Sequence, residues 1–434
     1  MKKFLTILLS CLLLLGGLSA CNTTPPTNPE KLQINYQNGV ITLTATEDAI
    51  KDVTDYKVFV NDLLLDQGST NTFDVARKII DTKPIAYGIW KITAQGFNGS
   101  SKVIDSESFT FEIKELNQQN FVNVLKNEYK STDYFLLNDD VYLYGRGISN
   151  LNNKNGYTTT VIQERGDGGN GIFFVKEPFT ATLDGDGYAL NFVVDEHINW
   201  SGSQLPFVYA GIFNEVQRGA VIKNVQVYMD SVYEVKSRST ASASFIFKHY
   251  GTIENVYVNQ INRPMIRPLK PNPDGSLSNE YEHRTDNYID KVDNKVAVIS
   301  HAESGARVYN SVFYTQVYNV DGTISLVTGG AVGYSKQGVE YNNCAYISDS
   351  GDARFFNLEN TATANSFVVP VSNNILFFSS AANFLSGTGE KVAGELKRTP
   401  LFVDFSGDAL AEFGNAWSNI DGEVYLMERL IEIY

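Results

Sequence analysis

The stretch Ala220-Val-Ile-Lys-Asn224-Val-Gln-Val-Tyr228 carries the pattern that decides the fold of this chain. Each copy of the pattern has an apolar residue two positions before an asparagine and alternating apolar residues after it. The four asparagines lie 31, 55 and 33 residues apart, which is typical of a solenoid built from stacked coils. The three further copies are Thr252-Ile-Glu-Asn255-Val-Tyr-Val-Asn259, Ala306-Arg-Val-Tyr-Asn310-Ser-Val-Phe-Tyr314 and Val339-Glu-Tyr-Asn-Asn343-Cys-Ala-Tyr-Ile347.

Stacked coils of parallel β-strands would explain this repeat physically. Each coil buries its inward side chains against the coils above and below, so the same pattern must return once per coil. Asparagine tolerates left-handed backbone angles at a turn, and stacked amides can hydrogen-bond along the axis. The sequence therefore predicts a parallel β-helix. The alternative is an antiparallel meander in which the Asn-Val pairs recur by accident.

Further segments before these repeats occur in the order found in a known family. They are Tyr134-Phe-Leu-Leu-Asn138-Asp-Asp-Val-Tyr-Leu143, then Phe179-Thr-Ala-Thr-Leu183-Asp184-Gly-Asp186-Gly-Tyr-Ala-Leu190, then Gly211-Ile-Phe213. Together with the first repeat they resemble bacterial surface proteins with GLUG-type repeats, although Ala181 and Asn214 stand where that family has glycine. The C-terminal run Trp417–Leu426 is similar to the end of such domains. The resemblance implies a right-handed β-helix over residues 116–434.

The period of the apolar residues changes just before this region. Phe121, Val124, Leu125 and Tyr129 have helical spacing, which predicts one amphipathic helix over residues 117–130. We expect it to cap the N-terminal end of the β-helix core.

Residues 31–115 show short alternating strands instead. Strands are expected at 32–36, 40–45, 56–61, 72–75, 90–96 and 108–113, with a turn at Asn38-Gly39. This count fits a β-sandwich of immunoglobulin size. The run Trp90–Gly99 resembles the penultimate strand of a fibronectin type III domain, with Trp90 where that family usually has tyrosine. The predicted fold class is thus all-β, a sandwich followed by the β-helix.

The N-terminus has the features of a sorting signal. Lys2 and Lys3 precede an apolar stretch of about a dozen residues, too short to span a bilayer. Leu18-Ser-Ala-Cys21 then resembles a bacterial lipobox, which predicts a signal peptide at residues 1–20 and lipidation of Cys21. A polar, proline-rich tether follows at residues 21–30. We expect a protein of the cell envelope, anchored by lipid on the outer face of a bacterial membrane and exposed to the exterior or the periplasm. The alternative is an ordinary secretory signal with a chance cysteine.

Composition excludes several classes of function. The chain of 434 residues has 35 Lys plus Arg against 49 Asp plus Glu, a net charge of −14, which argues against nucleic acid as a partner. Four histidines and three cysteines make a zinc cluster or a thiol enzyme unexpected. Cys344, at a repeat position among apolar neighbours, is expected to be a buried small residue rather than a nucleophile.

Two patterns of acidic residues are candidates for functional sites. Asp184 and Asp186 on a glycine-rich loop suggest a calcium site, but further ligands are missing and Asp-Gly pairs are ordinary turn chemistry, so no cofactor is expected. Polysaccharide lyases and hydrolases need carboxylates that converge on neighbouring coils. Spacing alone does not bring any pair together among the acidic residues available for this role, which are Asp139, Asp140, Asp195, Glu196, Asp290 and Asp293.

The insertion, residues 263–295, is the preferred ligand-binding candidate. It has four prolines within ten residues, so neither strand nor helix is expected there, and long loops on rigid solenoids often carry recognition. Its aromatic and cationic side chains suit a sugar or an anionic glycan, and Trp200 in a second loop suits sugar stacking. The alternative for both is a packing role. The candidate ligand-binding residues are Tyr281, His283, Arg284, Tyr288 and Trp200.

The sequence therefore predicts a surface lipoprotein that binds a glycan or a surface protein without changing it. The competing hypothesis is a surface-anchored β-helix polysaccharide lyase or glycoside hydrolase, and a third is an envelope protein with a purely structural role. Fold alone does not decide among them.

Overall fold

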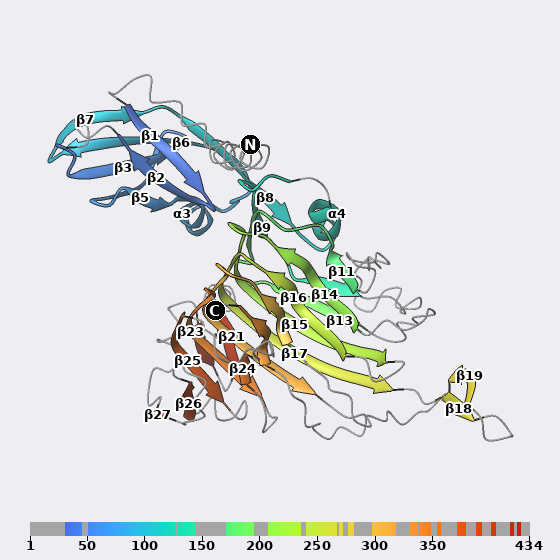
Figure 1. Ribbon diagram of the computed structural model, residues 1–434. Helices are drawn as coiled ribbons and strands as arrows, with labels where there is room; N and C mark the ends of the chain where they lie inside the picture. The colour runs from blue at the N-terminus through green and yellow to red at the C-terminus, as the bar shows by residue number, and fades with distance from the viewer. Residues whose placement is uncertain are drawn as a thin grey trace, which may run out of the picture. The chain divides into compact units, whose positions relative to one another are not determined.

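The protein is mostly β-strand and divides into two compact units, residues 1–111 and 112–434, which are described separately (Figure 1). No helix in the described part of the chain is long and apolar enough to cross a membrane. The computed structural model describes residues 31–45, 51–126, 129–144, 171–194, 207–235, 240–266, 269–271, 277–281, 297–317, 330–336, 338–348, 354–356, 371–378, 388–392, 401–404, 417–420 and 423–426.

The first unit consists of two sets of antiparallel strands. In one set β2 lies between β1 and β5, and in the other the order is β4–β3–β6–β7. The start of β1 also pairs in parallel with the end of β7. Alternate residues of β3 and of the middle of β6 are buried, as the period of two predicts. The bounds are β1 Lys31–Gln37, β2 Val40–Thr44, β3 Asp55–Val60, β4 Leu63–Gly68, β5 Thr72–Asp74, β6 Gly88–Asn98 and β7 Ser101–Ser106.

The predicted turn at Asn38-Gly39 is confirmed. Both residues have positive φ, 54° and 85°, and they join β1 to β2 as a two-residue hairpin. Asparagine followed by glycine is the pair that such a turn favours, because both central positions need left-handed angles.

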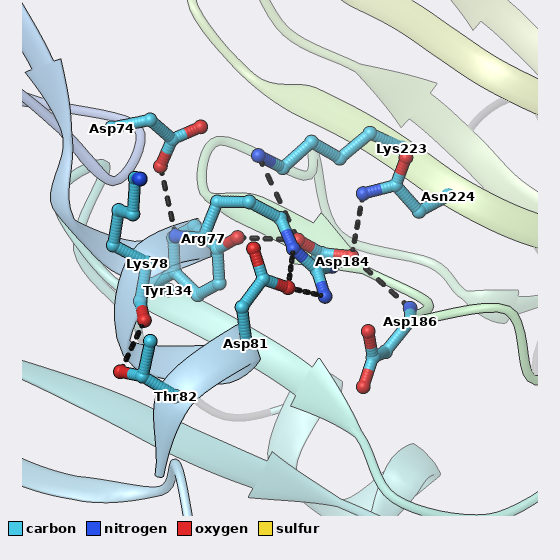
Figure 2. A network of polar contacts seen from close by, with 10 residues as sticks. All are labelled: Asp74, Arg77, Lys78, Asp81, Thr82, Tyr134, Asp184, Asp186, Lys223 and Asn224. Carbon is cyan, nitrogen blue, oxygen red and sulfur yellow. Dashed lines mark hydrogen bonds and ion pairs between the residues drawn. The ribbon is translucent and has the colours of Figure 1, made fainter. Parts of the chain in front are cut away.

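Helix α3 (Val75–Thr82) was not predicted, and the strand expected at 72–75 ends at Asp74 instead. The Asp74 side chain accepts a hydrogen bond from the Arg77 backbone amide at 2.9 Å and so begins the helix. Arg77 then pairs with Asp81 one turn later (Figure 2). Val75, Ala76 and Ile79 are buried, which places one face of this short helix in the core of its unit.

Trp90 makes a contact that explains its place near the start of β6. Its indole Nε1 donates to the carbonyl of Ala86, four residues earlier, at 2.7 Å. This hydrogen bond ties the start of β6 to the residues that precede it.

The second unit contains two long parallel ladders between which the chain alternates. One ladder has the order β11–β14–β16–β20–β22–β24, and the other contains β15–β17–β21–β23–β25. Each coil contributes one strand to each ladder, so the fold is parallel β-helix-like and the antiparallel meander is excluded (Figure 1). The bounds are β11 Gly171–Val175, β14 Phe207–Val216, β15 Val221–Val235, β16 Thr240–His249, β17 Thr252–Ile266, β20 Ala297–Ala302, β21 Arg307–Val317, β22 Gly330–Ser335, β23 Glu340–Ser348, β24 Arg354–Phe356 and β25 Val371–Phe378.

The second ladder extends towards the N-terminus through shorter strands. β12 and β13 pair with successive parts of β15, β9 and β10 pair with β12 and β13, and the end of β8 pairs with β9. After β25 the pairing becomes antiparallel. The bounds are β8 Phe109–Leu116, β9 Tyr134–Leu137, β10 Val141–Tyr144, β12 Thr182–Asp184, β13 Ala189–Val194, β26 Thr388–Val392, β27 Leu401–Asp404, β28 Trp417–Ile420 and β29 Glu423–Leu426.

The repeated asparagines bend the strands of the second ladder. Asn224, Asn255, Asn310 and Asn343 all have φ between 47° and 52°, the left-handed region that asparagine tolerates. The Asn255 amide donates to Asn224 Oδ1 at 3.1 Å, and the Asn343 amide donates to Asn310 Oδ1 at 3.2 Å. Both the backbone conformation and the axial hydrogen bonds predicted from the repeat are therefore present.

The amide stack is interrupted where the repeat spacing reaches 55 residues. Asn255 Oδ1 is buried and has no hydrogen-bond partner in the described part of the chain. The next coil places Ser311 nearby, and its hydroxyl accepts from the Val256 amide at 3.3 Å and donates to the Tyr309 carbonyl. The stack therefore forms two runs, one on each side of the insertion.

Aliphatic and aromatic side chains fill the interior of the coils. The residue two before each asparagine lies in one continuous core cluster, as the repeat predicts. Phe213 and Phe245 of the first ladder belong to the same cluster, and their rings meet edge to face. Because each coil must pack tightly against the next, the same pattern of buried residues recurs from coil to coil. The repeat positions in this cluster are Ile222, Ile253, Val308 and Tyr341.

Helix α4 (Phe121–Lys126) is shorter than the helix predicted over residues 117–130. Asn117 begins it late, because its side chain accepts from the amides of Gln119 and Asn120 and holds that segment in a turn. Phe121, Val122 and Leu125 are buried and belong to the core cluster of the coils.

Candidate functional site

The residues that the sequence singled out as ligand-binding are not placed by the structure. Cys21, Trp200, His283, Arg284 and Tyr288 lie outside the described residues. Tyr281 is the last residue of strand β19 (Leu277–Tyr281), where only the backbone is described.

The expectation that the prolines of the insertion exclude strands is wrong. Strand β17 continues through Pro264, whose backbone pairs with Tyr233 of β15. Leu269–Pro271 then forms strand β18, which pairs antiparallel with β19. Proline is tolerated at such positions because only one edge of its backbone lacks a hydrogen-bond donor.

Asp184 is a fully buried carboxylate surrounded by donors (Figure 2). Asn224 Nδ2 donates to its Oδ1 at 3.0 Å, and the Asp186 backbone amide donates to the same atom at 3.1 Å. Its Oδ2 accepts from the Tyr134 hydroxyl and lies 3.6 Å from Lys223 Nζ. This arrangement stabilises a buried anion with protein donors, and Asp184 is the first member of the asparagine stack.

These contacts do not provide the set of oxygen ligands that the suggested calcium site would need. Both oxygens of Asp184 already accept from protein donors, whereas calcium requires six to eight oxygen ligands in total. Within the described ranges there is no group of three histidine, cysteine, aspartate or glutamate side chains that could hold a metal ion.

Asp139 and Asp140 have local structural partners. The Asp139 side chain accepts from the Asp140 amide at 2.8 Å, and the Asp140 side chain accepts from the Ala189 amide at 2.8 Å. The other acidic residues considered for catalysis, Asp195, Glu196, Asp290 and Asp293, lie outside the described residues.

Two buried titratable groups lie in the core rather than in an open site. Burial lowers the pKa of His249 to about 4, and its Nε2 lies 3.2 Å from the Arg307 carbonyl, so the neutral imidazole donates there. Burial raises the pKa of the Cys344 thiol to about 12, and Cys344 is fully buried. The prediction that Cys344 is a small core residue is confirmed.

One column of outward side chains on the second ladder combines tyrosines with amides. Val225 and Val227 point into the core, so Gln226 and Tyr228 point outward. The register places one residue of each neighbouring coil beside Tyr228 in the same column. From β10 to β21 the members of this column, which we call the tyrosine–amide column, are Tyr142, Asn191, Tyr228, Asn259 and Tyr314.

Exposure changes along the tyrosine–amide column. Tyr228 is 36% exposed, whereas Tyr314 is 9% exposed and Ile347, its neighbour on the next coil, is 2% exposed. Tyr142, Asn191 and Asn259 are partly exposed. The accessible part of the column therefore extends from β10 to β17.

Tyr228 is held in a defined orientation. Its hydroxyl donates to Gln226 Oε1 at 2.8 Å, and Gln226 Nε2 donates to the Gly187 carbonyl at 2.9 Å. The Tyr257 ring, from the next coil, meets the Tyr228 ring edge-on with centroids 6.0 Å apart. Because its hydroxyl is bonded two residues back along its own strand, the ring lies along the sheet rather than away from it.

The sequence contains a signal for this column. Tyr228, Asn259 and Tyr314 each lie four residues after a repeat asparagine. Once these asparagines are superposed, the outward positions align coil by coil. What the alignment cannot supply is exposure, because Tyr314 and Tyr228 occupy the same position and differ in burial.

Comparisons with known proteins add little to these observations. No family model matches the chain, and no curated protein matches it. Among solved structures, the pectate lyase PelI from Erwinia chrysanthemi in complex with tetragalacturonic acid is similar at 9% identity and a TM-score of 0.17, over 87% of this chain and 98% of that chain. A likeness this low assigns neither a substrate nor a reaction to the protein.

Proposed function

We propose that this protein is a cell-surface lipoprotein that binds a glycan or protein ligand without catalysing a reaction on it. The observation that carries the proposal is the accessible part of the tyrosine–amide column, where Tyr228 is exposed and fixed by Gln226. Aromatic rings with nearby amides bind polymers by stacking and hydrogen bonding, and they have no group suited to acid–base catalysis at neutral pH.

The proposal includes the envelope location predicted from the N-terminus. Lipidation of Cys21 after removal of residues 1–20 would leave a mature net charge of 33 − 49 = −16. The Cys21→Ala variant is expected to lose its lipid and to leave the membrane fraction. The check is detergent partitioning of both proteins after expression in a bacterium that processes lipoproteins. Retention of the variant in the detergent phase would contradict the anchor.

The finer assignment of the fold is part of the same proposal. The strand order of the first unit and the Trp90 hydrogen bond to Ala86 support an immunoglobulin or fibronectin type III-like β-sandwich. The buried face of α4, within the core cluster of the coils, supports a role as N-terminal cap. The GLUG-type family and the right-handed sense of the coils rest on the sequence resemblance.

A glycan array with the unlipidated polypeptide, residues 22–434, tests the function. We expect selective retention of at least one glycan, and intact polymer when the bound material is analysed by size and by ultraviolet absorbance. Unlipidated protein carrying Asn191→Ala and Tyr228→Ala together is the matched control and should lose that retention.

Two other results would contradict the proposal, and a third would narrow it to a protein ligand. Shortened or unsaturated products would identify a polysaccharide-degrading enzyme. Retention of no glycan, together with binding of a surface protein, would remove the sugar and leave the recognition role. Retention of neither class would leave a structural role in the envelope.

A further inference from the structure

The accessible part of the tyrosine–amide column runs in one direction across the coils, and its side chains recur at a regular spacing. Its members lie on successive strands, so the column runs along the solenoid axis and crosses the strands. Adjacent strands are about 4.8 Å apart, so Tyr142 and Asn259 are separated by three spacings, roughly 14 Å. Tyrosine and asparagine alternate along this length. A ligand that contacts every member must therefore be extended and must repeat at a similar interval.

We propose that this column binds a neutral polysaccharide, extended along the solenoid axis, with a sugar ring stacked on Tyr228. The inference rests on the proposed binding function and names the ligand class and the site. A hexopyranose in an extended chain has a length close to the strand spacing. Each sugar then lies over one coil, with alternate sugars beside a tyrosine and beside an amide.

Tyr228 is prepared for stacking before a ligand arrives. The hydrogen bonds from Tyr228 to Gln226 and from Gln226 to Gly187 fix the ring, and the contact with Tyr257 limits its rotation. Binding does not have to immobilise this side chain, because its orientation is already restricted in the unbound protein. The 36% of Tyr228 that remains exposed is available to the apolar face of a sugar.

Asn259 provides a second, independent observation. Its Oδ1 is buried and has no hydrogen-bond donor among the residues that the structure describes. The Asn259 position is directly beside Tyr228 in the column. Buried acceptors are nearly always paired, so an acceptor without a protein donor beside an exposed ring fits a hydroxyl of the ligand, reached by rotation of the amide.

Charge selects a neutral polymer over an acidic one. The described outward side chains of this surface, from Tyr142 through Gln226 and Tyr257 to Asn259, include no cation, and the whole chain carries −14. Uronate polymers need cations to bind, and repulsion from the net charge opposes them. On the other side of the asparagine bend in the same ladder, the outward positions include four charged residues, which are Lys223, Glu254, Arg307 and Glu340.

Titration calorimetry with defined neutral polysaccharides and with polygalacturonate tests the assignment. The polypeptide of residues 22–434 is compared with Tyr228→Ala, Tyr228→Phe and the control Tyr309→Ala. Tyr309 also points outward, but it lies on the other side of the asparagine bend, among the charged residues. Its hydroxyl donates to Glu340 Oε2 at 2.6 Å. Thermal unfolding of each variant shows whether the fold is retained.

We expect a neutral polymer to bind, with affinity about tenfold lower in Tyr228→Ala, because the variant lacks the apolar ring on which a sugar stacks. Tyr228→Phe should lose less, because the ring remains and only its fixation is lost. Tyr309→Ala should bind as the unmodified chain does.

Two results would overturn the inference while the binding function stands. One is unchanged affinity for the neutral polymer in a folded Tyr228→Ala. The other is preference for polygalacturonate. Absence of binding by every polysaccharide would overturn both this inference and the glycan part of the proposed function.

Discussion

Replacing Asp184 with alanine is expected to destabilise the second unit by about 3–5 kcal/mol, the cost of removing one partner from a buried ion pair. Asp184 is fully buried, and the change leaves the Tyr134 hydroxyl and the Asn224 amide without their acceptor. Lys223 would also lose its buried counter-charge. Urea unfolding, followed by circular dichroism, should show a lower midpoint for the transition of this unit.

Asp186→Asn is the matched control for this prediction. Asp186 has φ of 46°, and asparagine tolerates that conformation, so the loop keeps its shape while a carboxylate is removed. We expect little change in its midpoint, and no dependence on calcium in the unmodified protein. An Asp184→Ala midpoint equal to that of Asp186→Asn would show that the buried contacts contribute nothing net.

Stability is expected to fall by about 3 kcal/mol between pH 6.5 and pH 4 because of His249 alone. Its pKa is lowered to about 4 by burial, from the ordinary 6.5, so the unfolded chain binds a proton in this range that the folded chain does not. The contribution of neutral His249 to the free energy of unfolding is therefore complete above pH 6.5, and it is lost as the pH falls towards 4. The measurement is the urea midpoint as a function of pH.

His249→Val isolates this effect from the titration of carboxylates in the same range. The register aligns His249 with Val216 on one side and with Ala302 on the other, so the position accommodates an aliphatic side chain. The difference between the two pH profiles should be flat above pH 6.5 and change steadily below it. Parallel profiles throughout would mean that His249 binds its proton equally well in both states.

The repeat made the long parallel ladders predictable. The asparagine returns in the four coils that contain Asn224, Asn255, Asn310 and Asn343 because the bend there needs a left-handed backbone conformation. The buried apolar residues recur at the same interval, so both requirements can be read from the sequence. The hairpin at Asn38-Gly39 was predictable for a similar reason. Where a backbone conformation requires one particular residue type, the sequence is sufficient to predict that conformation.

Other elements were missed because their signals are short or depend on distant residues. Helix α3 rests on the Asp74 cap and three buried side chains, and the preceding strand pattern continued into it. The strands within the insertion depend on pairing with distant residues, and its prolines predict no strand there. The tyrosine–amide column appears only when coils are in register, and its exposure is decided by what covers each coil.

The stacked amides also have a polarity. The side chains of Asn255 and Asn224 each donate towards the N-terminal coil, so their dipoles point the same way and end on the Asp184 carboxylate. Aligned peptide dipoles in a helix likewise favour a negative charge at the end where N–H groups point. Asp184 thus does for a stack of coils what an acidic first turn does for a helix. Its negative charge lies at the end of the stack towards which the amide N–H groups point. Asn224 and Asn255 therefore add their dipoles to the stack in the same direction.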